Sequence, residues 1–419
     1  MARQPVQAEV TPPPSKSITH RALIAAALCP TPTRLLNPLE AEDTRLTAAA
    51  LRSLGASIAH STAEWKVRGF PGGLPGREPS GPEPVLHLGN SGTSLRLLLP
   101  IAALARQPFI LDGVPRLRQR PVGPQVRALE ELGARIRWLG RPGYPPVEVC
   151  GPLAGGTLTL DAGASSQLLS GLLMAAPAAS GGVEVHLTAL SSGPYIDLTR
   201  SVLAAFGVRI QVLRPGVYRC RPSRPVSPGQ FRIEADASAA AFLLAAGVMT
   251  GGRMLVRGVG ADSLQGDRVV LDLLARMGCR TASGPDWMEA SGPPRAGLVA
   301  DLNATPDLVP PLFAVALFAP SSSRFTGIGH LRLKESDRIA ALAAEAARLG
   351  ARVIEERDAL GLEPARLSGA AVSAHADHRI AMALAVVGLG LPGMHLDDPG
   401  CVGKSYPGFF RELAVLAGG

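Results

Sequence analysis

The sequence predicts an α/β protein made of two similar lobes, each containing three repeats of about seventy residues. Two observations predict this architecture. A helix-ending pattern, a large apolar residue followed by Gly and then a small residue, recurs six times along the 419 residues. A second kind of helix, apolar on almost every face, alternates with the first at a similar period.

The first kind of helix is amphipathic and ends on that Gly pattern, as in "RALEELGA". We expect each Gly to adopt the left-handed conformation that closes a helix. The six positions, spaced 68–78 residues apart, are Gly55, Gly133, Gly207, Gly278, Gly350 and Gly418. β-branched segments such as "VRIQVL" and "RVIEE" often follow and predict strands.

The second kind of helix, as in "SQLLSGLLMAA" or "SAAAFLLAAGVM", is typical of a protein interior. Polar residues at its start recur every 69–75 residues: Ser17, Ser91, Ser166, Ser238, Asp307 and Asp377. Two independent markers with one period argue against a chance recurrence of Leu-Gly. Units of this size fold only by packing on their neighbours, which favours two groups of three. The Pro-rich segment from Arg219 to Phe231 is the predicted junction.

The charge of the chain predicts an anionic partner. The formal net charge is +8 and the isoelectric point is about 9.7. The cations are spread along the chain and aromatic residues make up only 4% of it, whereas nucleic-acid binders usually cluster cations beside stacking aromatics. Small anionic metabolites are therefore favoured, with nucleic-acid binding kept as an alternative.

Cysteine and histidine usage predicts neither a disulfide framework nor a metal site. The five cysteines lie far apart without a CxxC pair, which is typical of reduced thiols in the cytoplasm. Only His375 and His378 are close together, without further ligands at metal-binding spacing. The N-terminus lacks a signal pattern, and the longest uncharged stretch, 162–183, is interrupted by Pro177. We expect no metal and no membrane span.

Cations at predicted helix starts are the main functional clue. Helix N-termini carry partial positive charge and favour anions. Four cations violate this rule: Lys16, Arg338, Arg379 and Lys404. Each alone could be a solvated charge or a local ion pair, but four in register with a structural repeat favour a shared site for a multiply charged anion. Asp307 and Glu335 would be isolated carboxylates among these cations, suited to proton transfer.

Other catalytic patterns are weak. "GNSGTS" lacks the ending of a phosphate-binding P-loop, and neither GxGxxG at a strand–helix turn nor a GxSxG elbow is present.

Ten motifs in order carry a resemblance to a known family. They are "SKSITHRAL", "LGNSGTSLRLL", "GVPRLRQRPVG", "SSQLLSGLLMAAP", "SSGPYIDLT", "EADASAAAFLLAA", "SLQGDR", "LRLKESDRIAAL", "DHRIAMALAV" and "DPGCVGKSYPGFF". Together they resemble the enolpyruvyl transferases, in the 5-enolpyruvylshikimate-3-phosphate synthase branch, over almost the full chain.

The resemblance implies a fold and a reaction. The family fold has two lobes of three βαβαββ units around buried helices, an inside-out α/β barrel. It implies lobes at 15–233 and at 1–14 with 234–419, with the active site in the cleft between them. The family moves the enolpyruvyl group of phosphoenolpyruvate to the 5-hydroxyl of shikimate 3-phosphate through a tetrahedral intermediate, without cofactor or metal. A cytoplasmic monomer that binds neither nucleic acid nor membrane is expected.

The resemblance also implies the site residues. Shikimate 3-phosphate would be bound by Lys16, Ser17, Arg21, Ser165, Ser166, Gln167, Ser192, Tyr195, Asp307, His330 and Lys334. Phosphoenolpyruvate would be bound by Lys16, Asn90, Gly92, Arg120, Gln167, Arg338, Arg379 and Lys404. Asp307 would take the proton of the 5-hydroxyl, and Glu335, assisted by Lys16, would exchange a proton with the methylene carbon.

Three positions bear on these expectations. Pro14 stands where the family usually has Gly, and its fixed φ stiffens the turn before Lys16. His330 occupies a position that is often Asn, so its protonation state is open. Gly92 leaves the phosphoenolpyruvate pocket uncrowded, so we expect inhibition by glyphosate, which resembles that substrate.

Three alternatives compete with this interpretation. The sister enzyme that uses UDP-N-acetylglucosamine typically carries Cys in its mobile loop and Asn after the first Lys. In this chain the loop "GVPRLRQRPVG" has no Cys, and Ser17 follows Lys16. Nucleic-acid binding has only the basic isoelectric point in its favour. The presence of Asp307, Glu335 and Lys16, together with Arg379, argues against a catalytically dead relative.

Overall fold

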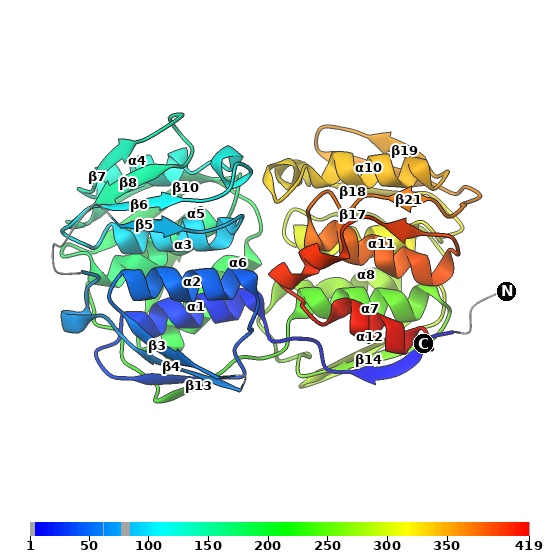
Figure 1. Cartoon of the computed structure of the whole chain (residues 1–419), viewed down its shortest axis with the longest axis horizontal. Helices are drawn as coiled ribbons and strands as arrows, with labels where there is room; N and C mark the ends of the chain where they lie inside the picture. The colour runs from blue at the N-terminus through cyan, green and yellow to red at the C-terminus, as the bar shows by residue number, and fades with distance from the viewer. Residues whose placement is uncertain (1–4, 62, 77–83, 419) are drawn as a thin grey trace. The chain divides into compact units, whose positions relative to one another are not determined.

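The computed structural model describes residues 5–61, 63–76 and 84–418, and we describe its two compact units separately. One unit comprises Pro14–Ile233, and the other comprises the chain up to Pro13 together with Glu234–Gly419. In both units, buried helices alternate along the chain with half-exposed ones (Figure 1).

The Pro14–Ile233 unit holds three helices of each kind among its described residues. The buried helices are α1 (Lys16–Ala27), α3 (Gly92–Ala102) and α5 (Gln167–Ala175). The helices with one exposed face are α2 (Glu42–Ser53), α4 (Gly123–Glu131) and α6 (Pro194–Ala205). The alternation predicted from hydrophobic patterning is therefore confirmed in this unit.

Three four-stranded sheets surround these helices. Their orders are β13-β2-β4-β3, β5-β6-β8-β7 and β9-β10-β12-β11. The strands are β2 (Thr33–Leu36), β3 (Ser57–His60), β4 (Glu64–Arg68), β5 (Val85–His87), β6 (Phe109–Asp112), β7 (Arg135–Trp138), β8 (Val147–Cys150), β9 (Gly156–Ala162), β10 (Val183–Leu190), β11 (Ile210–Arg214), β12 (Val217–Cys220) and β13 (Gln230–Arg232). In each sheet the first two strands are parallel and the last two form an antiparallel hairpin, which gives the βαβαββ unit.

The other unit repeats the pattern. Its buried helices are α7 (Ala237–Met249), α9 (Val309–Ala316) and α11 (His378–Gly390), and its outer helices are α8 (Val270–Arg276), α10 (Arg338–Arg348) and α12 (Phe409–Leu416). Its sheets are β1-β14-β16-β15, β17-β18-β20-β19 and β21-β22. The strands are β1 (Gln7–Val10), β14 (Arg253–Arg257), β15 (Arg280–Gly284), β16 (Trp287–Ser291), β17 (Val299–Asp301), β18 (Ser323–Thr326), β19 (Arg352–Glu355), β20 (Ala359–Glu363), β21 (Ala371–Val372) and β22 (His395–Leu396).

The first strand of one sheet in each unit comes from a distant part of the chain. β1 pairs in parallel with β14, and β13 pairs in parallel with β2. β1 therefore belongs to one unit, residues 14–233 form the other, and the chain re-enters the first unit after β13. Hydrophobic periodicity does not reveal these two pairings, because each joins strands roughly two hundred residues or more apart in the sequence.

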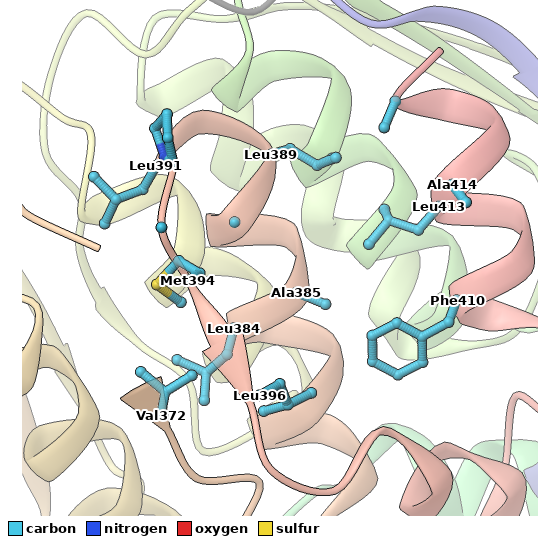
Figure 2. A pocket seen from close by; sticks show the side chains of 14 residues that line it. Val372, Leu384, Ala385, Leu389, Leu391, Met394, Leu396, Phe410, Leu413 and Ala414 are labelled. Carbon is cyan, nitrogen blue, oxygen red and sulfur yellow. The ribbon is translucent and has the colours of Figure 1, made fainter. Parts of the chain in front are cut away.

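The last repeat is shorter than the other five. Its described residues form the two-stranded sheet β21-β22, and α12 then packs beside α11. An apolar pocket of about 320 Å³ lies between Leu384 and Leu389 of α11, Met394, and Phe410 and Leu413 of α12 (Figure 2). It extends to the carboxyl end of α11, whereas the predicted ligands lie at the amino end of that helix.

The predicted glycine caps are confirmed. All six have positive φ, from 76° at Gly207 to 104° at Gly55. A side chain at Gly55 would also approach the carbonyl oxygen of Gly76 to 2.6 Å. Only Gly combines this conformation with this contact at low cost, so it ends the helix and turns the chain into the next strand.

Aliphatic packing holds each unit together. Leu, Ala, Val and Ile dominate both buried clusters, and α7 is buried along its whole length. Each fully buried Leu or Val contributes about 1.5–3 kcal/mol. This packing keeps the buried helices from sliding along their axes, so the polar first turn of each helix has a defined position.

Candidate active site

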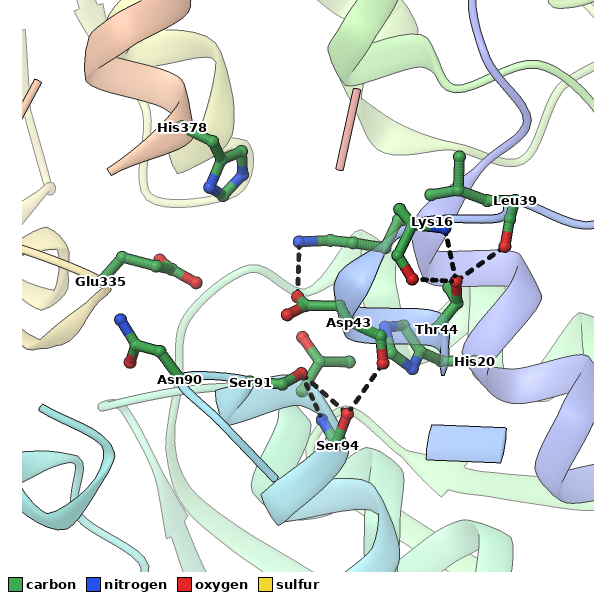
Figure 3. A network of polar contacts seen from close by, with 12 residues as sticks. Lys16, His20, Leu39, Asp43, Thr44, Asn90, Ser91, Ser94, Glu335 and His378 are labelled. Atoms are coloured by element: carbon green, nitrogen blue, oxygen red, sulfur yellow. Dashed lines mark hydrogen bonds and ion pairs between the residues drawn. The ribbon is translucent and has the colours of Figure 1, made fainter. Parts of the chain in front are cut away.

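The start of α1 presents Lys16 beside a buried carboxylate. Ser15 caps the helix by accepting a hydrogen bond from the backbone of Ile18, and Lys16 is the first helical residue. Lys16 Nζ lies 3.1 Å from Oδ2 of Asp43 in the first turn of α2 (Figure 3). The Asp43 side chain is only 1% exposed, so this ion pair holds the ammonium group near the amino end of α1 against the local dipole.

A buried hydroxyl network supports this pair. His20 Nδ1 lies 2.8 Å from the Thr47 hydroxyl, which lies 2.8 Å from that of Ser94. Ser94 Oγ donates to the backbone oxygen of Asp43 and lies 2.7 Å from Ser91 Oγ. The network ties the first turns of α2 and α3 to α1, so the Asp43 carboxylate has a defined place.

Arg21 joins three helices of the same unit. Its Nε donates to the hydroxyl of Thr199 at 2.8 Å, and its Nη1 donates to the carbonyl of Ser17 at 2.9 Å. Its Nη2 lies within hydrogen-bond distance of Ser170 Oγ and the Tyr195 carbonyl. Burial lowers the pKa of Arg21 to about 10, and the residue remains a cation at neutral pH.

Arg120 lies directly over Gly92. Its Nη1 donates to the Asn90 carbonyl at 3.1 Å, and the residue is 2% exposed. A Cβ on Gly92 would lie 2.2 Å from Arg120 Cζ. Gly92 is therefore required for this guanidinium to rest on the first turn of α3.

Gln167 links the first turns of α5 and α3. Its Nε2 donates to Thr93 Oγ1 at 2.9 Å, and its Oε1 accepts from Arg96 Nη1 at 3.2 Å. Ser165 Oγ accepts from the Gln167 backbone, and Ser166 is buried beside it.

Ser192 precedes α6 with a φ of 55°, and its carbonyl accepts from the backbone of Tyr195. The predicted ligands of the Pro14–Ile233 unit thus gather at the amino ends of four helices, where backbone N–H groups favour anions.

The other unit centres on Arg338, which is 1% exposed and paired with three carboxylates. Its Nε lies 2.8 Å from Asp377 Oδ2, its Nη1 lies 3.1 Å from Asp307 Oδ1, and its Nη2 lies 2.9 Å from Glu335 Oε2. Burial alone would lower the pKa of Arg338, but the three carboxylates, Asp377 foremost, outweigh it and raise the pKa. Arg338 is a permanent buried cation.

Arg379 extends this network. Its Nη2 lies 3.0 Å from both Asp307 Oδ2 and Ser238 Oγ. Its backbone N–H donates to Asp377 Oδ1, the N-cap of α11. Asp307 is therefore held by two arginines from two helices.

Two sequence expectations are wrong in detail. Asp307 and Glu335 are not isolated carboxylates, because Arg338 binds both. Lys404 ends a 3₁₀ helix, Pro399–Lys404, and does not begin a helix. Arg338 does begin a helix, because α10 starts there with Asp337 as its cap and with Glu335 before it. Sequence periodicity shows that a helix is near but not which residue caps it.

His330 and Lys334 lie in and after the 3₁₀ helix Gly329–Leu333. His330 is 9% exposed, and burial, reinforced by the charge of Lys334, lowers its pKa to about 4. Its imidazole is therefore neutral at physiological pH. Within the part of the chain that the structure describes, its Nε2 has no hydrogen-bond partner.

The predicted site residues do not include two positioning groups. Asp43 holds Lys16, and Arg96 holds Gln167. An acidic residue in the first turn of an ordinary surface helix looks like a dipole partner, so Asp43 gave no distinct signal. Arg96 was visible as a cation in a buried helix, which requires a polar partner.

Neither a metal cluster nor a membrane-spanning helix is found in residues 5–61, 63–76 and 84–418. They contain no group of three or more His, Cys, Asp or Glu side chains that could hold a metal ion. None of their helices is long and apolar enough to cross a membrane.

Comparison with known proteins gives one consistent result. The family model described as EPSP synthase (3-phosphoshikimate 1-carboxyvinyltransferase) matches residues 1–413. A 3-phosphoshikimate 1-carboxyvinyltransferase of Methanoculleus marisnigri is 44% identical over 412 residues, covering 98% of this chain and 96% of its own length. The enzyme of the same name from Thiobacillus denitrificans is 40% identical over 421 residues, covering 97% and 96%.

Solved structures agree with these matches. An EPSP synthase of Acinetobacter baumannii superposes with a TM-score of 0.81 at 27% sequence identity, covering 99% of this chain and 96% of that one. The predicted α/β architecture is confirmed by this similarity.

Proposed function

The chain belongs to the EPSP synthase (3-phosphoshikimate 1-carboxyvinyltransferase) family, and from this premise we propose which of its residues carry each step of the reaction. The enzyme transfers the enolpyruvyl group of phosphoenolpyruvate to the 5-hydroxyl of shikimate 3-phosphate, a step of the shikimate pathway of aromatic amino-acid biosynthesis, and releases phosphate.

The observation that carries the residue assignment is the Arg338 network. It holds Asp307 and Glu335 on one buried cation, with their carboxylate oxygens 3.1 and 2.9 Å from its nitrogens. Two carboxyl groups fixed on one rigid guanidinium are preorganised for proton transfer at two neighbouring atoms.

Asp307 and Glu335 divide the proton transfers. Asp307 accepts the proton of the 5-hydroxyl as the 5-oxygen of shikimate 3-phosphate bonds to C2 of phosphoenolpyruvate. Glu335 takes up a proton from solvent once phosphoenolpyruvate has displaced it from Arg338, and gives that proton to C3, which becomes a methyl group. In the second half, Glu335 takes a proton back from that methyl group while the C2–O bond to phosphate breaks. The proton first taken by Asp307 leaves with the phosphate, so the carboxyl groups are restored.

Substrate binding rearranges the arginines. Without ligand, Arg338 and Arg379 are paired with carboxylates. The carboxylate and phosphate of phosphoenolpyruvate match the bidentate geometry of guanidinium groups and replace some of these contacts. The exchange frees Asp307 and Glu335 to act on the substrates. Phosphoenolpyruvate also contacts Lys16, Asn90, Gly92, Arg120, Gln167 and Lys404.

Shikimate 3-phosphate binds through the hydroxyls and cations at the starts of α1, α5 and α6. Arg21 is buried among Thr199, Ser170 and Ser17, and is suited to fix this surface more than to move. The ligands are Lys16, Ser17, Arg21, Ser165, Ser166, Gln167, Ser192 and Tyr195, joined by Asp307, His330 and Lys334. The neutral His330 serves as an uncharged hydrogen-bonding group, in the place of the family's usual Asn.

The reaction requires both units. Asp307 and Glu335 belong to one unit, whereas most of the proposed ligands of shikimate 3-phosphate belong to the other. We place the active site in the cleft between lobes 15–233 and 1–14 with 234–419. The proposal includes a cytoplasmic monomer that binds neither nucleic acid nor membrane, which gel filtration and a binding assay on random RNA and DNA would test.

The testing experiment measures phosphate release with each substrate omitted in turn. We expect release only when phosphoenolpyruvate and shikimate 3-phosphate are both present, and none when UDP-N-acetylglucosamine replaces the latter. Asp307→Ala and Glu335→Gln should each abolish turnover while leaving the fold intact. Near-normal rates in either variant would overturn the proposed roles of Asp307 and Glu335.

A further inference from the structure

A strained loop leads into the helix that carries Arg379. Residues 373–376 connect β21 to α11. His375 and Ala376 have φ values of 52° and 50°, in the left-handed region that residues with a side chain avoid. Two consecutive residues in this conformation persist only where surrounding contacts hold them.

A buried carboxylate supplies such contacts. Glu345, in the last turns of α10, is fully buried. Its Oε1 lies 2.8 Å from His375 Nε2, and its Oε2 accepts from the backbone N–H of Ser373 at 3.1 Å. On the other side of the loop, Asp397 accepts from the backbone of Ala374 at 2.8 Å. An exposed arginine, Arg348, lies 3.4 Å from Glu345.

The loop delivers the next residue, Asp377, to the active site network. Asp377 caps α11 through the Arg379 backbone and pairs with Arg338 Nε at 2.8 Å. Arg338 and Glu345 are seven residues apart, about two helical turns, and so lie on the same face of α10. α10 therefore contacts the segment before α11 at two points about 10 Å apart along its axis. Glu345 binds the loop at Ser373 and His375, and Arg338 binds Asp377.

We infer that Glu345 and His375 are positioning residues that clamp this loop in its left-handed turn and thereby set the places of Arg338 and Arg379. The inference rests on the proposed function, in which these arginines bind phosphoenolpyruvate. Neither clamp residue touches substrate. Their effect passes through Asp377, the residue that both joins the loop to α11 and binds Arg338.

Charge makes the clamp specific. A fully buried carboxylate is costly unless it is paired, and Glu345 is paired by the loop itself. Releasing the loop would leave this charge with fewer hydrogen-bond partners, so the loop conformation and the hydrogen bonds to Glu345 stabilise each other. An apolar contact would hold the loop without this directional restraint.

The test compares the kinetic constants of two clamp variants and a control. His375→Ala removes one partner from a half-exposed position, and Glu345→Gln keeps the shape and removes the charge. We expect each to raise the KM for phosphoenolpyruvate about tenfold, the loss typical of one charge-assisted hydrogen bond. The KM for shikimate 3-phosphate should stay within about twofold. His87→Ala, an exposed histidine of β5 in the other unit, is the control and should change neither constant.

A rescue variant separates positioning from general stability. Ala376→Gly removes the steric cost of the left-handed conformation. Added to His375→Ala, it should recover most of the lost affinity for phosphoenolpyruvate. A purely structural role would instead lower the melting temperature in proportion to the loss, and glycine would not restore the KM.

The outcomes are distinguishable from failure of the proposed function. An unchanged KM for phosphoenolpyruvate in both His375→Ala and Glu345→Gln overturns the clamp. Arg379→Lys reports on the function itself: if it too leaves that KM unchanged, the assignment of the phosphoenolpyruvate site fails. A strong effect of Arg379→Lys with no effect of the clamp variants refutes only the inference.

Discussion

Gly92→Ala provides a quantitative test of the site. The new Cβ would lie 2.2 Å from Arg120 Cζ, 2.4 Å from Nη2 and 2.7 Å from Nε. Non-bonded carbon atoms rest about 3.5–4.0 Å apart, so the guanidinium must retreat by roughly 1.3 Å or more. Hydrogen bonds tolerate a few tenths of an ångström, so Arg120 cannot keep its present contacts with the first turn of α3.

The expected effect falls on binding and not on folding. The displaced atoms are the far end of a flexible side chain, and a helical Ala is more favourable than Gly by about 0.5–1 kcal/mol. We therefore expect a melting temperature within about 2 °C of the parent. Loss of a hydrogen bond to a charged group costs about 1.5–3 kcal/mol, equivalent to a KM for phosphoenolpyruvate roughly 10- to 150-fold higher.

The assay is phosphate release against phosphoenolpyruvate concentration at saturating shikimate 3-phosphate. Gly76→Ala is the matched control, because its Cβ would meet no described atom within 4 Å. Arg120→Ala and the double variant Gly92→Ala/Arg120→Ala complete a cycle in which the two effects should not add. Fully additive losses, or an unchanged KM in Gly92→Ala, would refute the reasoning.

Four further predictions follow from other parts of the structure. Asp43→Asn removes the carboxylate that holds Lys16, and kcat for phosphate release should fall about 10- to 100-fold; an unchanged kcat would show that Lys16 needs no such partner. Burial holds the pKa of His330 in the folded chain at about 4, below the usual value of about 6.5 in the unfolded chain. Between these two pH values the unfolded chain binds a proton at His330 that the folded chain does not bind, so the folded state loses stability as pH falls through this window. In urea titrations at pH 7 and 4.5, His330→Asn should therefore lose less stability than the parent, and equal losses would contradict this origin. Gly350→Ala places a side chain at a φ of 86° and should cost about 1–2 kcal/mol, seen as a melting temperature several degrees lower, whereas an unchanged value would show that the cap is not strained. Glyphosate should inhibit competitively with phosphoenolpyruvate, and full turnover at millimolar glyphosate would count against the assignment of Gly92 and Arg120 to the phosphoenolpyruvate site.

The repeat architecture could be predicted because its physical causes are local. Apolar residues on every face mark a buried helix. A Gly that follows the last large apolar residue marks the end of an amphipathic helix. Both signals come from within one helix, so Gly133 and Gly278 could be assigned without knowing any tertiary contact. The pairing of β1 with β14, and of β13 with β2, had no such local cause and was not apparent from periodicity.

The site was predictable only in part for the same reason. Lys16 and Arg338 violate the helix-dipole preference, and that violation is visible in the sequence. Their partners are not visible in the sequence, because Asp43 is 27 residues from Lys16 in another helix and Asp377 is 39 residues from Arg338. Nothing in the spacing of Glu345 and His375 indicates that the fold brings them together.

The most direct test of the central claim follows hydrogen exchange at C3 of phosphoenolpyruvate. If Glu335 gives a proton to this carbon and takes one back, the parent enzyme turning over in D₂O should place deuterium in the methylene group of recovered phosphoenolpyruvate, and only when shikimate 3-phosphate is present. Glu335→Gln should bind both substrates and incorporate none. Incorporation by Glu335→Gln at the parental rate would show that another group moves this proton and would contradict the account.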